Sequence, residues 1–176
     1  MHSVISTGEI TRKGASDSKT EHGFMIKIFT HLKSFGIPFA VIGGHAVNYH
    51  GYVRATEDSD IIFKRTADSE LSLYQALRDI NACWLSNEID PGTGMEREVP
   101  VNMEYIRNNH LMMLYTGMGY LDIFDFIPGF PETPVDEILN SCDTFQGILM
   151  VSLEWLKKMK QSTGRPKDLI DLENLP

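Results

Sequence analysis

Residues 39–63 have the sequence FAVIGGHAVNYHGYVRATEDSDIIF, and this stretch decides the expected fold. Its first four residues form a continuous apolar run that ends in two glycines, Gly43 and Gly44, which is typical of a buried strand leading into a tight turn. Asp58–Phe63 is the second apolar run and predicts another strand. Thirteen residues separate the glycines from this run, enough for one or two helical turns over His45–His50 and for a return beside the first strand.

The segments on either side predict helices. Before the first strand, apolar residues recur every three or four positions from Phe24 to Phe35, which is the stripe of an amphipathic helix, and Gly36 stands at its expected end. After the second strand, Thr66 and Asp68 are suited to cap a helix with a similar apolar stripe. Sheet and helix therefore alternate over the first half of the chain.

The second half of the chain adds a hairpin and a helical end. A Gly-bearing turn over residues 116–119 separates two apolar runs and predicts an antiparallel hairpin, whereas residues 86–109 have weak periodicity and give no firm prediction. The expected elements are the hairpin strands Leu111–Tyr115 and Tyr120–Phe126, a short helix Val135–Ser141, a last strand Gln146–Val151, and the helices Leu153–Gln161 and Pro166–Leu175. This order predicts an α/β (α+β) fold, a mixed sheet flanked by helices, with residues 1–20 as a polar tail and residues 21–176 as one domain.

The composition is that of an ordinary globular protein. The chain has 176 residues, of which 42% are hydrophobic and 23% charged, and a net charge of -8, which excludes disorder for most of its length. No apolar run approaches the ~18–20 residues that cross a bilayer, and the N-terminus lacks a secretory stretch, so we expect a cytoplasmic protein with no membrane partner. Cys83 and Cys142 are too far apart in sequence to suggest a disulfide framework or a zinc site.

Two carboxylates open the second predicted strand. Side chains two residues apart on a strand point the same way, so Asp58 and Asp60 would project side by side, with Ser59 on the other face. Such a pair repels unless a cation lies between its members, and oxygen ligands without His or Cys favour Mg²⁺ or Mn²⁺. The alternative is that both residues are turn or cap residues at the start of a strand.

A third carboxylate lies in the predicted hairpin. Asp122 stands among apolar residues of the second hairpin strand, where an aspartate is costly unless it is paired or metal-bound. Asp125 is its rival, but strand alternation puts Asp125 on the other face, so Asp122 is the candidate. The glycine turn ahead of a potential helix adds bare backbone amides, which can bind phosphate oxygens.

Together with Asp122, the segment VIGGHAVNYHGYVRATEDSDIIF resembles the signature of the polymerase-beta-like nucleotidyltransferase superfamily: a hydrophobic strand, two small residues, a spacer and Asp-x-Asp. The Arg-x-Thr-x-Asp-x-Asp form, here Arg54, Thr56, Asp58 and Asp60, is most similar to small bacterial nucleotidyltransferases related to the abortive-infection (AbiEii-type) toxins. YLDIFDFIPG resembles the strand of their third carboxylate, at Asp122, and LEWLKKMKQSTGRPKDLIDLENL is similar to their closing helices.

The resemblance implies an enzyme that transfers a nucleoside monophosphate from a nucleoside triphosphate to an acceptor hydroxyl and releases pyrophosphate. It implies that three carboxylates are catalytic and bind Mg²⁺ (or Mn²⁺), namely Asp58, Asp60 and Asp122. The nucleotide contacts that it implies are those of Gly43, Gly44, Arg54, Thr56, Lys160 and Arg165. A transfer RNA or other RNA, a protein and a small molecule all remain open as acceptors. The resemblance also suggests the toxin of a toxin–antitoxin or phage-defence pair, with an antitoxin protein as partner.

Lys160 has a reason of its own to need an anion. It lies four residues after Leu156, on the helix face that is expected to turn toward the body of the protein. Its partner is either a triphosphate or the carboxylates of Asp168 and Asp171, which are also placed to meet the dipole of their own helix. Arg54 likewise either reaches the phosphates or braces the loop before the Asp-x-Asp pair.

The basic residues are concentrated near the C-terminal end. Residues 153–167 contain five Lys and Arg against one Glu, which suits a triphosphate or an RNA backbone, although an exposed lysine face is commonly only solvated. Two other functions stay open at this point. One is a non-catalytic nucleotide-binding or interaction module with the same fold, and the other is a structural domain whose carboxylates bind no metal.

Overall fold

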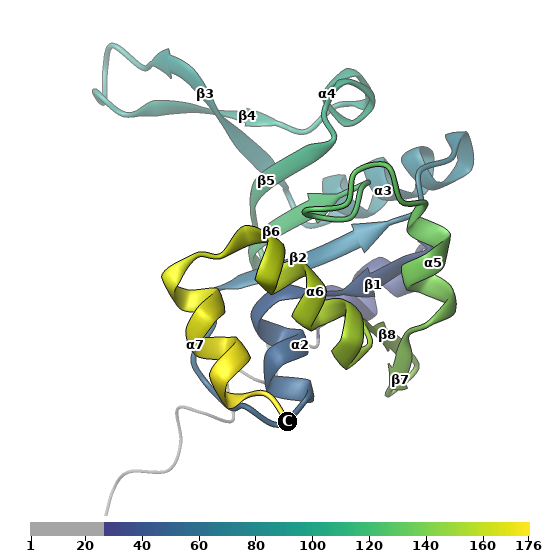
Figure 1. Cartoon of the computed structure of the whole chain (residues 1–176). Coiled ribbons are helices and arrows are strands. Elements are labelled where there is room, and N and C mark those ends of the chain that lie inside the picture. Colours follow the sequence, from purple (N-terminus) through teal and green to yellow (C-terminus); the bar gives the residue numbers. More distant parts are fainter. Residues whose placement is uncertain (1–26) are drawn as a thin grey trace, which may run out of the picture.

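One eight-stranded sheet forms the centre of the protein in a computed structural model that describes residues 27–176 (Figure 1). The tail expected over residues 1–20 and the domain start expected at residue 21 lie outside the described residues. The strands are β1 (Phe39–Val41), β2 (Asp58–Phe63), β3 (Cys83–Ile89), β4 (Glu96–Pro100), β5 (Leu111–Thr116), β6 (Gly119–Phe124), β7 (Asp143–Phe145) and β8 (Ile148–Met150). Their order across the sheet is β4-β3-β5-β6-β2-β1-β8-β7. The β1–β8 and β2–β6 pairs are parallel and the others antiparallel, which confirms the predicted mixed sheet.

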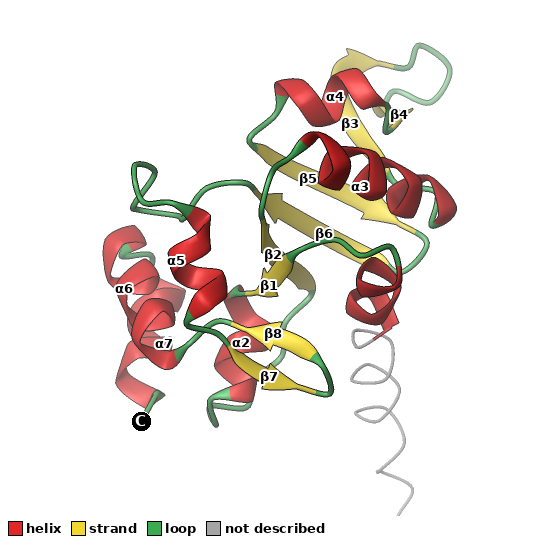
Figure 2. Ribbon diagram, turned by 90° about the vertical axis from the view of Figure 1, so that its right-hand side faces the viewer, coloured by secondary structure: helices red, strands yellow, loops and turns green. Residues whose placement is uncertain are grey.

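Helices cover both faces of this sheet. They are α2 (Gly43–Tyr49), α3 (Ala67–Asp79), α4 (Met103–Asn108), α5 (Val135–Asn140), α6 (Leu153–Thr163) and α7 (Pro166–Asn174), and residues 27–34 are helical as well. Figure 2 shows α3 and α4 on one face and α2, α5, α6 and α7 on the other. The predicted α/β class with a helical C-terminal end is confirmed. Between residues 27 and 176, none of the helices is both long and apolar enough to span a bilayer.

Strand alternation divides the apolar side chains between two cores. Val41 of β1 and Ile61 of β2 belong to the core that α3 and α4 cover, whereas Ala40 and Ile62 belong to the core that α2 and α6 cover. Asp60 lies two residues before Ile62 and therefore shares its face of the sheet. The Asp-x-Asp carboxylates thus stand on the side of α2, α6 and α7.

Several local predictions are confirmed. The strand predicted over Asp58–Phe63 has the same bounds in the structure, and β1 and β2 pair directly as antiparallel neighbours. A Gly-bearing turn joins β5 to β6. Thr66 caps α3, because its side chain accepts a hydrogen bond of 3.1 Å from the amide of Ser69.

Other bounds differ from the prediction. Helix α2 begins at Gly43 and so includes the glycine turn. Gln146 and Gly147, expected in the last strand, form the turn between β7 and β8 and have positive φ angles of 50° and 76°, a conformation that a strand excludes. Strand β6 ends at Phe124, so the predicted hairpin strand is two residues too long.

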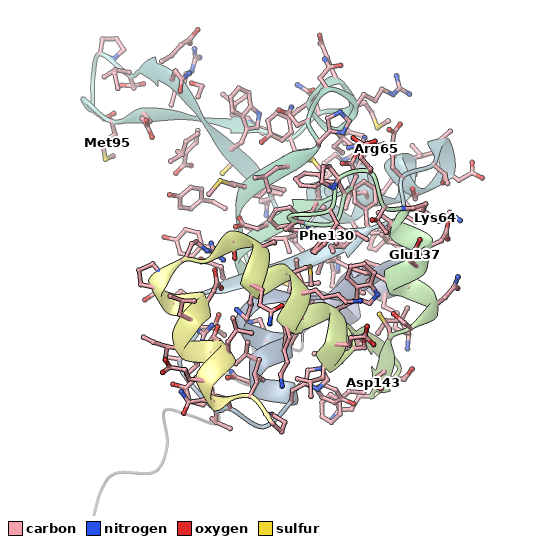
Figure 3. The ribbon with its side chains drawn as sticks, viewed as in Figure 1. Lys64, Arg65, Met95, Phe130, Glu137 and Asp143 are labelled. Atoms are coloured by element: carbon pink, nitrogen blue, oxygen red, sulfur yellow. The ribbon has the colours of Figure 1, made fainter. Side chains whose placement is uncertain are left out.

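The segment that gave no firm prediction, residues 86–109, contains the second part of β3 and all of β4 and α4. Strands β3 and β4 form a hairpin that extends away from the rest of the sheet (Figure 1), and Figure 3 shows Met95 near its tip. Most side chains of β4 are exposed. An exposed hairpin of this kind needs no apolar face, which explains why the sequence shows no period there.

Candidate active site

Asp58, Asp60 and Asp122 project from two neighbouring strands on one face of the sheet. Strands β2 and β6 pair in parallel, with Asp60 opposite Asp122 and Asp58 opposite Tyr120. Asp60 and Asp122 therefore stand side by side. Asp58 lies two residues before Asp60 on the same face of β2. All three line one pocket of about 550 Å³. The sheet thus brings together carboxylates that are far apart in the sequence.

The glycine turn at the start of α2 lies directly against Asp60. Gly43 has a φ of +62°, and a Cβ atom there would overlap the Asp60 carboxylate, so both the conformation and the space require glycine. A Cβ on Gly44 would overlap the side chain of Thr56. The Gly44 amide donates a hydrogen bond to Asp60. An amide expected to bind phosphate is therefore used, in this structure, to hold a carboxylate.

Two of the three carboxylates, Asp60 and Asp122, have raised pKa values. Burial, followed by the charges of Asp122 and Asp58, raises the pKa of Asp60 to about 6. The Gly44 amide and the charge of Lys167 oppose that rise. Burial and the charge of Asp58 likewise raise the pKa of Asp122 to about 6. The site therefore concentrates negative charge that the surrounding protein compensates only in part.

The donor set fits a hard divalent cation in its chemistry. It offers carboxylate oxygens alone, which suit Mg²⁺ or Mn²⁺. As the side chains stand, no group of three or more His, Cys, Asp or Glu residues in the described part of the chain is arranged to hold a metal ion. Mutual repulsion without a counter-charge gives carboxylates a reason to turn apart. Metal binding by Asp58, Asp60 and Asp122 stays a prediction.

Arg54 reaches the pocket from the loop between α2 and β2, and its charge is already paired. Its Nε and Nη2 atoms donate to the two carboxylate oxygens of Asp171 at 2.6 and 2.8 Å. Asn48 of α2 fixes the backbone of Arg54 through hydrogen bonds of 2.9 and 3.0 Å. The structure shows Arg54 bracing the loop. A contact to phosphate stays a prediction.

Lys160 and Arg165 are also paired with carboxylates. Lys160 is only 5% exposed, and its Nζ lies 2.9 Å from Asp168 and 2.6 Å from Asp171. Arg165 Nε donates to Asp168 at 2.7 Å. Burial tends to raise the pKa of both aspartates, but these hydrogen bonds outweigh it and hold each pKa below its ordinary range. Of the two partners open to Lys160, the structure shows the carboxylates, which join α6 to α7.

Lys167 is a pocket residue that the sequence prediction of the site omitted. It lines the same pocket, its side chain is exposed, and its charge lowers the pKa of Asp60. Within residues 27–176 it takes part in none of the ion pairs. Lys167 lies in the first turn of α7, where a cation opposes the helix dipole. That unfavourable placement is a sequence signal that would have singled it out.

The pocket is lined by both charged and apolar side chains. The acidic and basic groups described above are joined by Thr56 and Thr163. The apolar residues that line it are Ile42, Leu111, Met113, Phe124, Pro128, Leu156 and Met159. A pocket that joins an apolar wall to a few convergent charged groups is typical of a small-molecule site.

Asp125 lies outside this pocket. Its carboxylate pairs with Arg65, which also binds Glu70 at 2.8 Å, and His110 Nδ1 lies 2.9 Å from it. Arg65, which follows β2, donates two further hydrogen bonds to the backbone carbonyls of Ile106 in α4 and of Asn109 directly after it, so the cluster ties the end of β2 to the end of α4. Asp125 therefore has a structural role, and Asp122 is the carboxylate that stands opposite Asp60.

Several solved structures are similar to this chain. The antibiotic-resistance factor ANT(2'')-Ia superposes with a TM-score of 0.55 at 14% identity, over 88% of this chain and 82% of that one. A nucleotidyltransferase-like protein from Paracoccidioides brasiliensis gives a TM-score of 0.49 at 18% identity, over 91% and 76% of the two chains. JHP933 from Helicobacter pylori gives 0.46 at 15% identity, over 90% of this chain and 66% of that one. No protein-family model matches the sequence, and no curated protein matches it either.

The chain has a nucleotidyltransferase-like fold. This conclusion rests on the mixed sheet with its flanking helices and on the likeness to ANT(2'')-Ia. At this level of identity the likeness concerns the fold alone, so the activity has to be argued from the site. The similarity to the AbiEii-type branch stays a prediction.

Proposed function

We propose that the protein is a Mg²⁺-dependent nucleotidyltransferase, which moves a nucleoside monophosphate from a nucleoside triphosphate to an acceptor hydroxyl. The observation that carries this proposal is the placement of Asp60 opposite Asp122, with Asp58 on the same face, in a pocket that basic side chains from α6, α7 and the loops before β2 and α7 also line. The raised pKa values of Asp60 and Asp122 add to it, because perturbed carboxylates in a cleft are typical of functional sites.

Three groups of pocket residues have different roles in the proposed reaction. Asp58, Asp60 and Asp122 would hold the divalent ions, which when bound supply the positive charge that stabilises the attacking and leaving oxygens. Lys167 is placed to attract the triphosphate, since it lines the pocket without a carboxylate partner among residues 27–176. Gly43 and Gly44 keep the backbone close to Asp60, so that no side chain fills the space beside it.

The proposed reaction forms one bond, breaks one bond and moves one proton. The acceptor oxygen forms a bond to the α-phosphorus, the bond between the α- and β-phosphates breaks, and pyrophosphate leaves with that electron pair. The proton of the acceptor hydroxyl passes to the carboxylate of Asp122 and then to solvent.

A direct test measures label transfer from α-labelled nucleoside triphosphates in the presence of Mg²⁺, with RNA, protein and small-molecule acceptors offered separately. Wild-type protein should transfer label and release pyrophosphate. Asp60→Asn and Asp122→Asn should each lower the rate by about a hundredfold or more, since each removes a proposed metal ligand.

The matched control is Asp143→Asn, because Asp143 is exposed on β7, away from the pocket (Figure 3). It should leave transfer unchanged. Transfer that persists in Asp60→Asn would exclude the proposed chemistry. If the nucleotide and Mg²⁺ raise the melting temperature but no acceptor is ever labelled, the protein is the non-catalytic nucleotide-binding module that the sequence left open.

A further inference from the structure

The face that carries the three carboxylates continues onto strands β5 and β6, where none of the helices within residues 27–176 covers it. Met113 of β5 lies opposite Asp122, and Tyr115 lies opposite Tyr120, so these side chains share that face. Met113, Tyr115, Tyr120 and Leu111 are 63%, 39%, 46% and 40% exposed. We call these four residues the β5–β6 platform. Figure 1 shows α6 and α7 over the other half of the sheet, which leaves the platform open.

The β5–β6 platform is continuous with the proposed active site. Leu111 and Met113 line the same pocket as Asp122, and Tyr120 lies opposite Asp58 on the neighbouring strand. The nucleotide-side cations come from α6, α7 and the loop before β2, on the other wall of this pocket. A molecule seated on the platform would therefore approach Asp122 from the side away from the basic wall, where an acceptor hydroxyl is needed.

The platform offers aromatic rings to a ligand. The rings of Tyr115 and Tyr120 lie 4.8 Å apart in an edge-to-face arrangement. Half-exposed tyrosines held by strand pairing lose little conformational freedom when they bind a flat or apolar group. Tyrosine faces also attract a positive charge within about 6 Å.

The charge that borders the platform is negative on both sides. Asp122 and Asp58 flank it on β6 and β2. On the other side, Glu96 and Glu98 of β4 lie within electrostatic reach of Tyr115. The basic residue of β4, Arg97, alternates to the opposite face, where it lies 3.5 Å from Glu88.

The net charge is also negative over residues 83–126, the segment that contains β5 and β6. Residues 83–126 contain seven Asp and Glu, two Arg and no Lys, and Arg107, the second arginine, pairs with Glu70. A phosphate backbone needs cations along its path, whereas this surface repels an anion and attracts a cation. A nucleic acid end is therefore the acceptor that the surface fits least.

We infer that the β5–β6 platform is the acceptor site and that it takes a small hydroxyl compound with a flat apolar ring and a positive charge. Tyr115, Tyr120 and Met113 would bind the ring, and the carboxylates of Glu96 and Glu98, which are not among the proposed metal ligands, would favour the cation. This inference rests on the proposed function, because an acceptor site has a role only if the protein transfers a nucleotide. The test measures binding alone, so the acceptor site and the proposed transfer activity can fail separately.

The test follows the methyl signal of Met113 by NMR in full-length protein labelled at methionine methyl groups, without nucleotide. Met113→Leu assigns that signal. Three probes are compared: phenylalaninol, which has a ring, a hydroxyl and an ammonium group; its N-acetyl derivative, which lacks the charge; and a single-stranded oligoribonucleotide of about five residues. Phenylalaninol should shift the Met113 signal with a dissociation constant in the millimolar range, and the N-acetyl form should bind about three- to tenfold more weakly.

Two variants localise the binding. Tyr120→Ser should weaken phenylalaninol binding about threefold or more, whereas Tyr49→Ser, which removes a comparably exposed tyrosine from α2, should not. The inference is overturned if the oligoribonucleotide shifts Met113 more strongly than phenylalaninol does, or if no probe shifts it up to about 20 mM. Binding without any label transfer would instead count against the proposed enzyme activity alone.

Discussion

Asp60 is surrounded by groups that disfavour its charge. Burial and two neighbouring carboxylates raise its pKa to about 6, and Gly43 approaches so closely that any Cβ would displace it. Neither feature stabilises the fold. Both are understandable if a cation occupies the space beside Asp60 in the working protein, because binding sites often retain arrangements that lower stability.

The pH dependence of stability should reveal this charge. The folded pKa of Asp60 and Asp122 is about 6, whereas an unfolded aspartate titrates near ~3.9. The folded state then binds more protons between these values, so stability falls as pH rises through this window. In metal-free urea unfolding, Asp60→Asn should raise the free energy of unfolding by about 1–2 kcal/mol at pH 8, by about half as much at pH 5, and change it little near pH 3.5, below the unfolded pKa.

Asp143→Asn is the control for this measurement, since Asp143 is exposed on β7, and it should show no such difference between these pH values. An Asp60→Asn gain of the same size at all of these pH values would mean that the charge of Asp60 is not what lowers stability.

A second residue-scale prediction separates backbone strain from crowding. Gly43 and Gly36 have similar φ angles, +62° and +71°, but a Cβ would meet nothing within 4 Å at Gly36 and would overlap Asp60 at Gly43. Gly36→Ala should cost about 1 kcal/mol, the price of a left-handed alanine. Gly43→Ala should cost at least about 1 kcal/mol more, because overpacking is added, and should also weaken Mg²⁺ binding in calorimetry. Equal costs would argue that Gly43 is needed only for its φ.

At the scale of elements, α6, α7 and the loop before β2 are joined by one buried ion cluster. Asp171 is fully buried and binds both Arg54 and Lys160, while Asp168 binds Lys160 and Arg165. The cluster fixes the basic wall of the pocket relative to the sheet. It also explains why the lysine on the inner face of α6 is tolerated, since a buried charge is costly unless it is paired.

Removing one member of this cluster should be far more damaging than removing a surface pair. Asp171→Ala leaves Lys160 and Arg54 without their shared partner and should destabilise the protein by about 3–5 kcal/mol. Glu154→Ala removes an exposed ion pair on the same α6 helix, in which Lys158 Nζ lies 2.7 Å from Glu154, and should cost less than about 1 kcal/mol. Comparable losses in urea unfolding would show that the cluster does not hold α6, α7 and the loop together.

At the scale of the whole molecule, the sheet has a buried centre and an exposed hairpin of β3 and β4, which we call the β3–β4 arm. Strand β2 is paired on both sides, with β1 and β6, and its last three residues are fully buried. Strand β4 pairs with β3 alone and is mostly exposed. The carboxylates of the proposed active site lie on the central strands, so the part of the sheet that carries them is also the part with the most complete packing.

Hydrogen exchange should follow this division. The amides of Ile61, Ile62 and Phe63 should exchange only through global unfolding, whereas those of β4 should exchange through local opening of the arm, at least about a hundredfold faster. Mass spectrometry of peptides from both regions measures the difference. Equal protection would show that the arm unfolds together with the central sheet.

Much of the fold could be predicted because local pattern controls it. The bounds of β2, the Gly-bearing turn between β5 and β6, and the cap at Thr66 follow from short-range residue preferences. The β3–β4 arm could not, because exposed strands carry no apolar period. The turn at Gln146 was missed because apolar residues of β8 follow it at once, so the pattern does not show where the strand starts.

The sequence by itself determined β1, β2, the β5–β6 hairpin and most of the helices, the placement of the two Asp-x-Asp side chains on one face, and the choice of Asp122 over Asp125 as a candidate. Only the tertiary structure decided which charges meet. It placed Asp122 opposite Asp60, gave Lys160 and Arg54 to Asp171, and left Lys167 facing the carboxylates. The physical reason is that strand and helix periods are local, whereas ion pairing depends on the register between strands and the docking of helices that lie far apart in the chain.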